Sequence, residues 1–438
     1  MLAEYARQLR SLSRNAWLYL ISNAIQLVSA GALAILYTLY LVAVGYNTAF
    51  IGVLADLGVI AAVGAIIPAS RLVRRWGWRR TLIWSDMIGA ISLGVQLVYP
   101  QPAVVIVTTL GVGASVALLF VVNAPLLAAY STEEERTALF AINNAVALLA
   151  GVVGLLLGGV LPEWFLSPGV RDSSLLVAIT PWLVHGAHAR AYELALLVTG
   201  ALALPSIIPV LMLREAAPIR DNAADASPGV RLALPTREQL GRWWMLARGT
   251  IGRFAFTQAL VGFGAGLFGP YVNIYFVDVL KATTTTYSAL ASALSILTAI
   301  GTLAAVPLAN HLGKIRTVVL TQVSSLPFLL ALGLAPSLLI ASIAYLIRGP
   351  LMNIANPPMQ AYIMEAVPTD QRILASSTYN VVFQVAWAVG SGVGGLLILR
   401  AGYPPVFVIA AMLYAMSIAL VAFWFGGSGP KSSETAPA

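Results

Sequence analysis

Twelve long apolar runs divide this chain, and they limit what it can fold into more than any other feature. A helix that crosses a bilayer needs about 20 largely apolar residues. Runs of this kind lie near residues 17–44, 48–69, 81–99, 103–130, 138–161 and 192–213, and again near 250–280, 287–309, 317–334, 337–364, 373–399 and 406–425. They predict an all-α membrane protein with twelve transmembrane helices.

The composition agrees with a chain that lives in lipid. Only 10% of the 438 residues are charged, against roughly 25% in soluble domains. The first run is too long for a signal-peptide core, so we expect it to remain in the mature protein. Residues 175–184 are also apolar, but Pro181 breaks them. We interpret them as an interfacial piece of a loop, with a re-entrant element as the alternative.

The basic residues predict the orientation of the helices. Most of the 25 lysines and arginines fall in segments that share one side with the N-terminus, and the opposite loops hold only Arg171, Arg190, Lys281 and Arg400. Positive charge accumulates on the cytoplasmic side of membrane proteins. We therefore expect a multi-pass protein of the plasma membrane with both termini in the cytoplasm. The net charge of +8 orients the chain in the bilayer, and no nucleic acid is expected as a partner.

The two halves of the sequence repeat in register. A constant offset of 236 relates the pairs Gly77 and Gly313, Arg80 and Arg316, Thr81 and Thr317, Arg136 and Arg372, Asn144 and Asn380, Gly154 and Gly390, Gly158 and Gly394, and Gly159 and Gly395; an offset of 235 relates Tyr40 to Tyr275. Six helices return the chain to its starting side, so the copies run parallel. We predict two pseudo-symmetric six-helix bundles, residues 1–213 and 249–438, joined by a cytoplasmic linker at 214–248.

The loop between the second and third runs resembles the signature of the major facilitator superfamily, and the resemblance covers nearly the whole chain. That signature places basic residues around a glycine, as Arg75, Gly77, Arg79 and Arg80 do here. The second copy keeps Gly313, Lys314 and Arg316, whereas Ser70 and Arg74 depart from the pattern. The resemblance implies a conformational gate at these loops. It also implies secondary transport by a monomer without a cofactor, like prokaryotic twelve-helix members.

A glycine series in the fifth run is similar to the antiporter signature of that family, although Leu155 replaces its proline. Val107 also stands where the arginine of another family motif would be. Close packing of helices in lipid explains such small residues equally well. We expect Gly154, Gly158, Gly390, Gly394 and Gly395 to face other helices, so that leucine at Gly158 or Gly394 impairs folding or movement.

Two charged residues lie deep within predicted helices. Arg348 is eleven residues beyond Ser337, about 16 Å into a core of roughly 30 Å. Such a cation either faces a central cavity, where Arg348 is a candidate for substrate binding, or makes a buried structural ion pair or carbonyl contact. Asp56 is its natural counterpart, and proton coupling and static pairing are both open for it. Snorkelling or capping near helix ends explains Asp86, Arg253, Asp278 and Glu365.

The resemblance implies that the first, fourth, seventh and tenth helices line a substrate cavity. Polar and aromatic residues there, with two more from the eleventh helix, are candidates for substrate binding: Tyr37, Tyr40, Tyr271, Asn273, Tyr275, Asn353, Asn356, Gln384 and Trp387. Taken singly, each is better explained by hydrogen bonds between helices than by substrate binding. Pro350, Pro357 and Pro358 are expected to kink the tenth helix beside Arg348.

Enzyme signatures are missing from the sequence. The chain has no cysteine, its three histidines form no metal cluster, and Gly313-Lys314 lacks the rest of a phosphate-binding loop. We expect no enzymatic activity and no metal. The predicted function is secondary transport of a small organic solute, anionic or amphipathic, with efflux favoured over uptake and protons as one coupling ion. The alternatives are a facilitative uniporter and a receptor or scaffold on the same fold.

Overall fold

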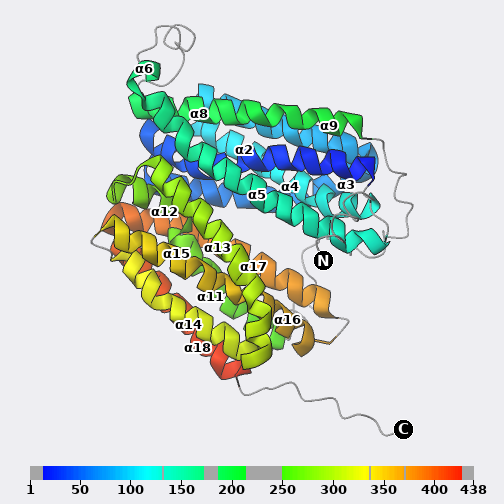
Figure 1. The fold of residues 1–438 in the computed structure, drawn as a ribbon, viewed down its shortest axis with the longest axis vertical. Coiled ribbons are helices and arrows are strands. Elements are labelled where there is room, and N and C mark those ends of the chain that lie inside the picture. Colours follow the sequence, from blue (N-terminus) through cyan, green and yellow to red (C-terminus); the bar gives the residue numbers. More distant parts are fainter. Residues whose placement is uncertain are drawn as a thin grey trace. The chain divides into compact units, whose positions relative to one another are not determined.

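The computed structural model describes residues 13–130, 133–171, 186–213, 249–334, 337–368 and 371–426, and these are helical without strands. The predicted linker at 214–248 and the apolar piece at 175–184 lie outside them. Twelve described helices are long and apolar enough to cross a membrane, which confirms the predicted fold class. The elements (Figure 1) are α2 (Arg14–Val44), α3 (Thr48–Val98), α4 (Pro102–Ala129), α5 (Glu133–Leu166), α6 (Pro168–Arg171), α8 (Ala187–Ala203), η1 (Leu204–Ser206), α9 (Ile207–Met212), α11 (Thr250–Phe268), η3 (Gly269–Tyr271), α12 (Val272–Ile274), η4 (Tyr275–Val279), α13 (Thr284–Leu312), α14 (Lys314–Gly333), α15 (Leu338–Ile354), α16 (Asn356–Ala366), α17 (Arg372–Ala401) and α18 (Tyr403–Phe425).

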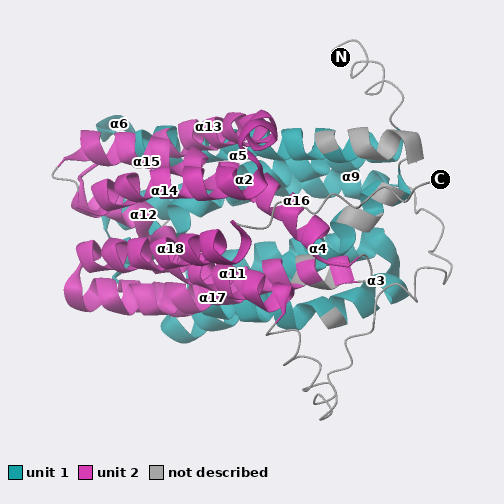
Figure 2. Cartoon of the chain, turned by 90° about the horizontal axis from the view of Figure 1, so that it is seen from below, with its two compact units in different colours: residues 1–46, 56–232, 283–289 teal, residues 47–55, 233–282, 290–438 magenta. Residues whose placement is uncertain are grey.

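The chain forms two compact units, coloured separately in Figure 2. Unit 1 comprises residues 1–46, 56–232 and 283–289, and unit 2 comprises residues 47–55, 233–282 and 290–438. The first residues of α3 therefore group with unit 2, and the first residues of α13 group with unit 1.

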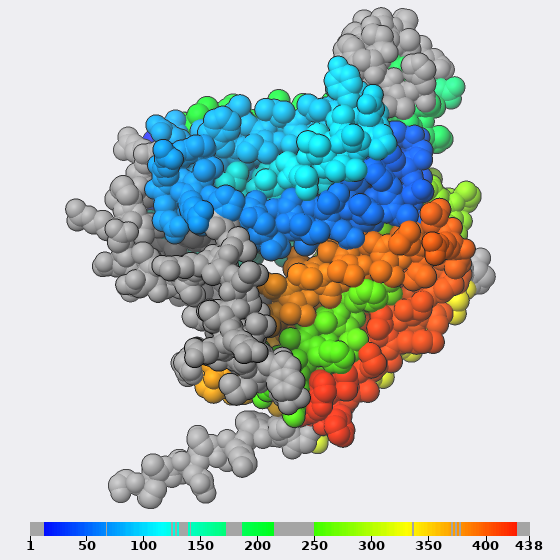
Figure 3. All heavy atoms as spheres, turned by 180° about the vertical axis from the view of Figure 1, so that it is seen from behind, coloured from blue at the N-terminus to red at the C-terminus, as the bar shows by residue number. Residues whose placement is uncertain are grey.

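Glycines allow the main helix pair of each unit to pack closely. In unit 1, a Cβ atom on Gly154 of α5 would lie 3.0 Å from the Cα of Gly31 on α2. In unit 2, a Cβ atom on Gly390 of α17 would lie 3.1 Å from the Cα of Phe263 on α11. Figure 3 shows α17, α11 and α18 as adjacent orange, green and red bands. Gly158, Gly394 and Gly395 also face helix backbone, which confirms the prediction for the whole series.

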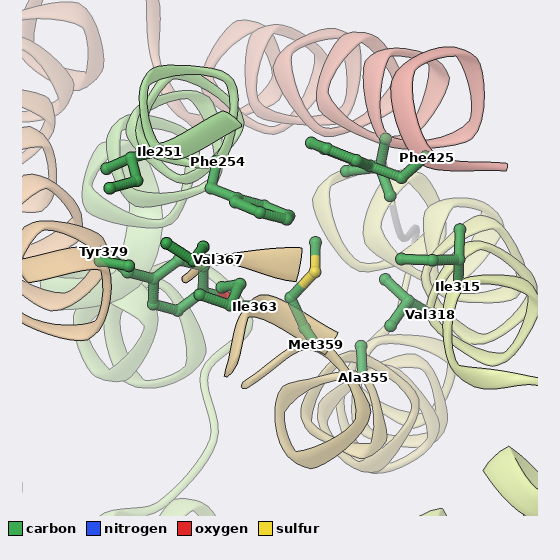
Figure 4. Close-up of a cluster of buried hydrophobic side chains, with 12 residues drawn as sticks. Ile251, Phe254, Ile315, Val318, Ala355, Met359, Ile363, Val367, Tyr379 and Phe425 are labelled. Atoms are coloured by element: carbon green, nitrogen blue, oxygen red, sulfur yellow. The ribbon is translucent and has the colours of Figure 1, made fainter. Parts of the chain in front are cut away.

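Aromatic side chains fill one end of unit 2. Phe254 of α11 stacks on Phe425 of α18 with ring centroids 4.3 Å apart, and Tyr362 of α16 meets both rings edge-on. Met359 and Ile363 of α16 belong to the same cluster, shown in Figure 4. Lipid tails are as apolar as these side chains, so the gain from the cluster comes from van der Waals packing rather than from removal of water. The cluster holds α11, α16 and α18 together.

The internal repeat extends to individual hydrogen bonds. In unit 1 the Tyr40 hydroxyl donates to the Leu97 carbonyl at 3.3 Å, and in unit 2 the Tyr275 hydroxyl donates to the Leu332 carbonyl at 3.0 Å. Both tyrosines are buried. The offset that relates the two tyrosines also relates the two carbonyls, so the copies share a bond that joins helices far apart in the sequence.

Several helices differ from the predicted boundaries. The basic stretch that we expected as a loop is helical on both sides of Gly77, which alone breaks α3 with φ 79° and ψ 170°. The seventh run is interrupted at Gly269 and Pro270, where η3 begins. The tenth run breaks at Ala355, before Pro357, as the proline pair predicted, whereas Pro350 lies inside α15 without ending it.

Candidate functional site

Arg348 is held among aromatic rings within unit 2. It lies ten residues beyond Leu338, the first residue of α15, about 15 Å along the helix. Its Cζ atom is 4.8 Å from the ring centroid of Phe268 and 5.5 Å from that of Tyr414. Both rings are almost fully buried. The rings' electron-rich faces stabilise a guanidinium that has lost water. Within the described part of unit 2, two aromatic residues therefore contact this cation.

The hydrogen-bonding capacity of Arg348 is mostly unused. One Nη atom donates to the Tyr414 hydroxyl at 3.3 Å, and the buried Nε atom has no hydrogen-bond partner among the residues that the structure describes. A guanidinium has five N–H donors in a planar fork that fits carboxylate or phosphate groups. A buried donor without an acceptor costs free energy. The residue is therefore suited to receive an anionic group, and substrate binding by Arg348 stays a prediction.

The aromatic partner of Arg348 comes from a break in a helix. Phe268 ends α11, and Gly269 and Pro270 follow it in η3. The indole nitrogen of Trp387 on α17 would lie 3.5 Å from a Cβ atom on Gly269. Irregular backbone at membrane depth occurs where protein buries it or where it lines a cavity. The Gly-Pro pair was visible in the sequence, but we did not interpret it as a break.

Three predicted substrate-binding tyrosines use their hydroxyls on helix carbonyls. Tyr271 is fully buried and donates to the Ser391 carbonyl at 2.7 Å. Tyr40 and Tyr275 make the repeated bonds to Leu97 and Leu332. These bonds join helices within each unit. A role of these tyrosines in substrate binding stays a prediction.

The predicted amides of unit 2 lie at different levels of exposure. Asn273 is buried, and its side-chain oxygen accepts from the Ile274 N–H at 2.9 Å. Asn353 donates to the Gly349 carbonyl at 2.9 Å and accepts from Asn356 at 3.2 Å across the break between α15 and α16. Gln384 is exposed. Asn353 and Asn356 thus mark a helix break at Ala355, about two turns beyond Arg348.

Tyr37 belongs to a polar chain within unit 1. The amide of Gln96 on α3 donates to the Tyr37 hydroxyl, and Thr108 of α4 donates to the Gln96 carbonyl oxygen at 3.2 Å. Gln96 and Thr108 are buried. These hydrogen bonds link α2, α3 and α4. The sequence selected Tyr37 and missed both partners.

Asp56 and Asp86 are two acids of α3 for which the sequence predicts different roles. Asp56 has a buried Oδ1 atom; its pairing with Arg348 and its role in proton coupling stay predictions. Asp86 was expected near a helix end, but it lies nine residues beyond Gly77, about 13 Å along α3. The Gln26 amide of α2 donates to its Oδ1 at 2.6 Å. A side-chain bond to a neighbouring helix therefore replaces the expected snorkelling.

The predicted gate residues surround two glycines of the same geometry. Gly77 has φ 79° and ψ 170°, and Gly313 has φ 85° and ψ 152°. Each accepts a hydrogen bond at its carbonyl, from Thr81 at 2.8 Å and from Thr317 at 2.9 Å. The side chains of Arg75, Arg80 and Arg316 are exposed, and that of Arg79 is half-buried. In unit 2, Lys314 pairs with Glu365 of α16. The gating role itself stays a prediction.

Comparison with known proteins gives one family model and two kinds of relative. The model described as Major Facilitator Superfamily matches residues 19–252 and 254–438. Proteins described as uncharacterized MFS-type transporter YhhS, from Salmonella typhimurium (strain LT2) and Escherichia coli (strain K12), are 26% identical over 188 residues. That match covers 43% of this chain and 44% of each relative, so it spans less than half of their length.

Solved structures match nearly the whole chain at low sequence identity. The nucleoside transporter NupG superposes with a TM-score of 0.70 at 14% identity, covering 93% of this chain and 98% of NupG. A D-xylose-proton symporter superposes with a TM-score of 0.66 at 13% identity, covering 94% and 97%. At these identities the likeness establishes the fold alone.

Proposed function

Because the chain belongs to the Major Facilitator Superfamily, we propose that it is a secondary transporter that moves a small organic solute across the plasma membrane by alternating access. Its bundles comprise residues 1–213 and 249–438, with a cytoplasmic linker at 214–248 and both termini in the cytoplasm. The protein works as a monomer. Solute or proton gradients drive it, with efflux favoured over uptake.

The observation that carries this proposal is the state of Arg348. Within the described part of the chain, its Nε atom is buried without an acceptor, and one of its Nη atoms makes a hydrogen bond of 3.3 Å to the Tyr414 hydroxyl. Keeping a cation inside a membrane helix costs at least about 2.5–3.5 kcal/mol on insertion scales. A scaffold gains nothing from that cost. A transporter for a carboxylate or phosphate gains a bidentate contact near the middle of the bilayer.

The Phe268 and Tyr414 rings favour a solute with an apolar body. They cover the guanidinium on its sides and leave its donors for an anionic group. A small organic anion fits this surface better than a free inorganic ion, because the apolar part gains contacts with the rings. Nucleoside and xylose specificity belong to the matched proteins, and nothing in the Arg348 surroundings assigns either to this chain.

The test is uptake and binding by the full chain in liposomes. A panel of aliphatic and aromatic carboxylates and phosphate monoesters is screened under solute and pH gradients. Arg348→Ala is expected to weaken binding of the selected solute by about 10- to 100-fold, the loss of a charged hydrogen bond worth about 1.5–3 kcal/mol. Arg348→Lys keeps the charge but loses the planar fork of donors. Its affinity for the solute should therefore lie between those of the unsubstituted protein and Arg348→Ala.

Arg253→Ala is the matched control. Arg253 also lies beside an aromatic ring of unit 2, 5.8 Å from the Trp424 centroid, but it is exposed. Its replacement should leave binding unchanged. Unaltered affinity in folded Arg348→Ala protein would instead make Arg348 a structural residue. Saturable flux without coupling to any gradient would identify a uniporter, and absence of saturable flux or binding would favour a receptor or scaffold.

A further inference from the structure

Asp86 is a carboxylate well inside α3 that the sequence did not select. It lies nine residues after Gly77 and twelve before Val98, about 13 Å and 18 Å along the helix. Its Oδ1 atom accepts a hydrogen bond of 2.6 Å from Gln26 of α2. Its Oδ2 atom is buried and has no hydrogen-bond partner in the described ranges of the chain.

The surroundings of Asp86 are polar but carry no compensating charge among the described residues. Asn23, one turn before Gln26 on α2, donates to Asn143 of α5 at 2.9 Å. Tyr19 of α2 is within electrostatic reach of the carboxylate. On the α4 side, Ser85 donates to the Ser115 carbonyl at 2.9 Å. These neighbours are amides, hydroxyls and one phenol.

The charged side chains that the structure describes on α2, α4 and α5 lie far from this position along their helices. Arg14, the charged residue of α2, is twelve positions before Gln26, about 18 Å away along the helix. Pro102–Ala129, the residues of α4, include no charged residue. Among the described side chains of α5, Glu163 is twenty positions beyond Asn143, about 30 Å. No lysine, arginine or histidine of the described part of the chain forms an ion pair with Asp86.

The second copy of the repeat shows what the fold requires at this place. The offset of 236 that relates Gly77 to Gly313 pairs Asp86 with Gln322 of α14, and the offset of 235 that relates Leu97 to Leu332 pairs it with the adjacent Thr321; both are buried. A neutral side chain, the Gln322 amide at the offset of 236, therefore satisfies the same packing position. The carboxylate of Asp86 is an addition to the common framework, and burying it costs more than burying the amide.

We propose that Asp86 is a proton-binding site and that Gln26 is its positioning residue. The proton bound by Asp86 is the one whose movement is coupled to transport, and this coupling step rests on the proposed function. A proton from water binds the Oδ2 atom and converts the carboxylate into a neutral carboxylic acid. Gln26 donates to Oδ1 in both forms, because that oxygen is an acceptor in the acid and in the carboxylate. The site switches between charged and neutral without a new partner for Gln26.

The first experiment needs no substrate. Infrared difference spectra of the full chain in liposomes are recorded while pH is stepped across the range in which the protein stays folded. A protonated-carboxyl band that grows as pH falls is expected for the unsubstituted protein, and Asp86→Asn should lose one component of it. Gln26→Leu should move that component to higher frequency, because the carbonyl oxygen loses its hydrogen bond. Gln322→Asn, at the related position, should leave the component unchanged.

Two spectroscopic results would overturn the proposal. A band identical in Asp86→Asn means that another acid titrates. A component assigned to Asp86 that stays constant at every pH means a permanently protonated structural group. A transport assay separates proton coupling from solute movement. In this assay Asp86→Asn should lose solute accumulation driven by a pH gradient and keep exchange of solute across the bilayer. Loss of solute exchange in Asp86→Asn, together with a pH-dependent carboxyl band that this substitution leaves unchanged, would contradict coupling at Asp86. Absence of transport in the unsubstituted protein would contradict the proposed function alone.

Discussion

Unit 1 and unit 2 share a framework and differ in their charges. Both contain a tyrosine bonded to a helix carbonyl, at Tyr40 and Tyr275, with the same spacing to the acceptor. Unit 1 then adds Asp86, where unit 2 has the neutral Gln322, and unit 2 adds Arg348, where unit 1 has Val112. The comparison separates residues that the repeated fold needs from residues that one copy alone has acquired. The acquired charges are the ones to which we assign function.

Alanine at the helix-crossing glycines is expected to have the largest effect on stability. A Cβ atom on Gly154 or Gly390 would overlap a backbone carbonyl, of Val28 or Phe263. Backbone cannot move aside as a flexible side chain can, so each substitution should cost about 3 kcal/mol. Both variants should therefore show a lower midpoint of thermal unfolding in detergent. Gly64→Ala, at a helical position with open space, is the control and should not lower it.

That experiment also tests the equivalence of the two crossings. Similar decreases in the unfolding midpoint of Gly154→Ala and Gly390→Ala would support a framework common to the two units. A normal midpoint in either variant would mean that its helix pair is looser than the structure indicates, and the comparison between the units would fail at this point.

Alanine at the two gate glycines is expected to have an intermediate effect. Gly77 and Gly313 adopt positive φ with extended ψ, a region that is essentially restricted to glycine and costs other residues about 1–3 kcal/mol. Gly77→Ala and Gly313→Ala should each lower the unfolding midpoint, and transport should slow as well if the gate prediction is right. Loss of stability without any change in transport would limit these glycines to a structural role.

Removal of the repeated tyrosine hydroxyls is expected to have the smallest effect. Tyr40→Phe and Tyr275→Phe each delete one hydrogen bond to a carbonyl, worth about 0.5–1.5 kcal/mol. The two single losses should be equal and should add in the double variant, measured by thermal unfolding. Solute binding should not change. Weaker binding in either variant would instead support the original prediction that these tyrosines contact substrate.

The sequence predicted what depends on length and register. Twelve helices follow from runs of apolar residues, because only a helix satisfies the backbone in lipid. The contacts of Gly154 and Gly390 follow from the constant offset and from the rule that small residues mark helix crossings. The fold class and the packing face of the glycine series could therefore be derived without coordinates.

The surroundings of the charges could not be derived in this way. The Phe268 and Tyr414 rings reach Arg348 from two other helices, and no local pattern encodes such a meeting. Asp86 was assigned to a helix end because the preceding basic stretch looked like a loop, whereas the helix is broken at Gly77 alone. A partner sixty residues away, Gln26, then completed a site that sequence spacing does not reveal.

The repeated tyrosine bond also bears on the history of the chain. Duplication of a six-helix segment would give both copies this bond at once, and later drift would then act on each copy separately. A hydroxyl that reaches a carbonyl 57 positions away is easily lost by a single change to phenylalanine, yet it is present twice. Tyr40 and Tyr275, with their acceptors Leu97 and Leu332, thus supply reference points for aligning the copies at the offset of 235, beside the pairs at the offset of 236.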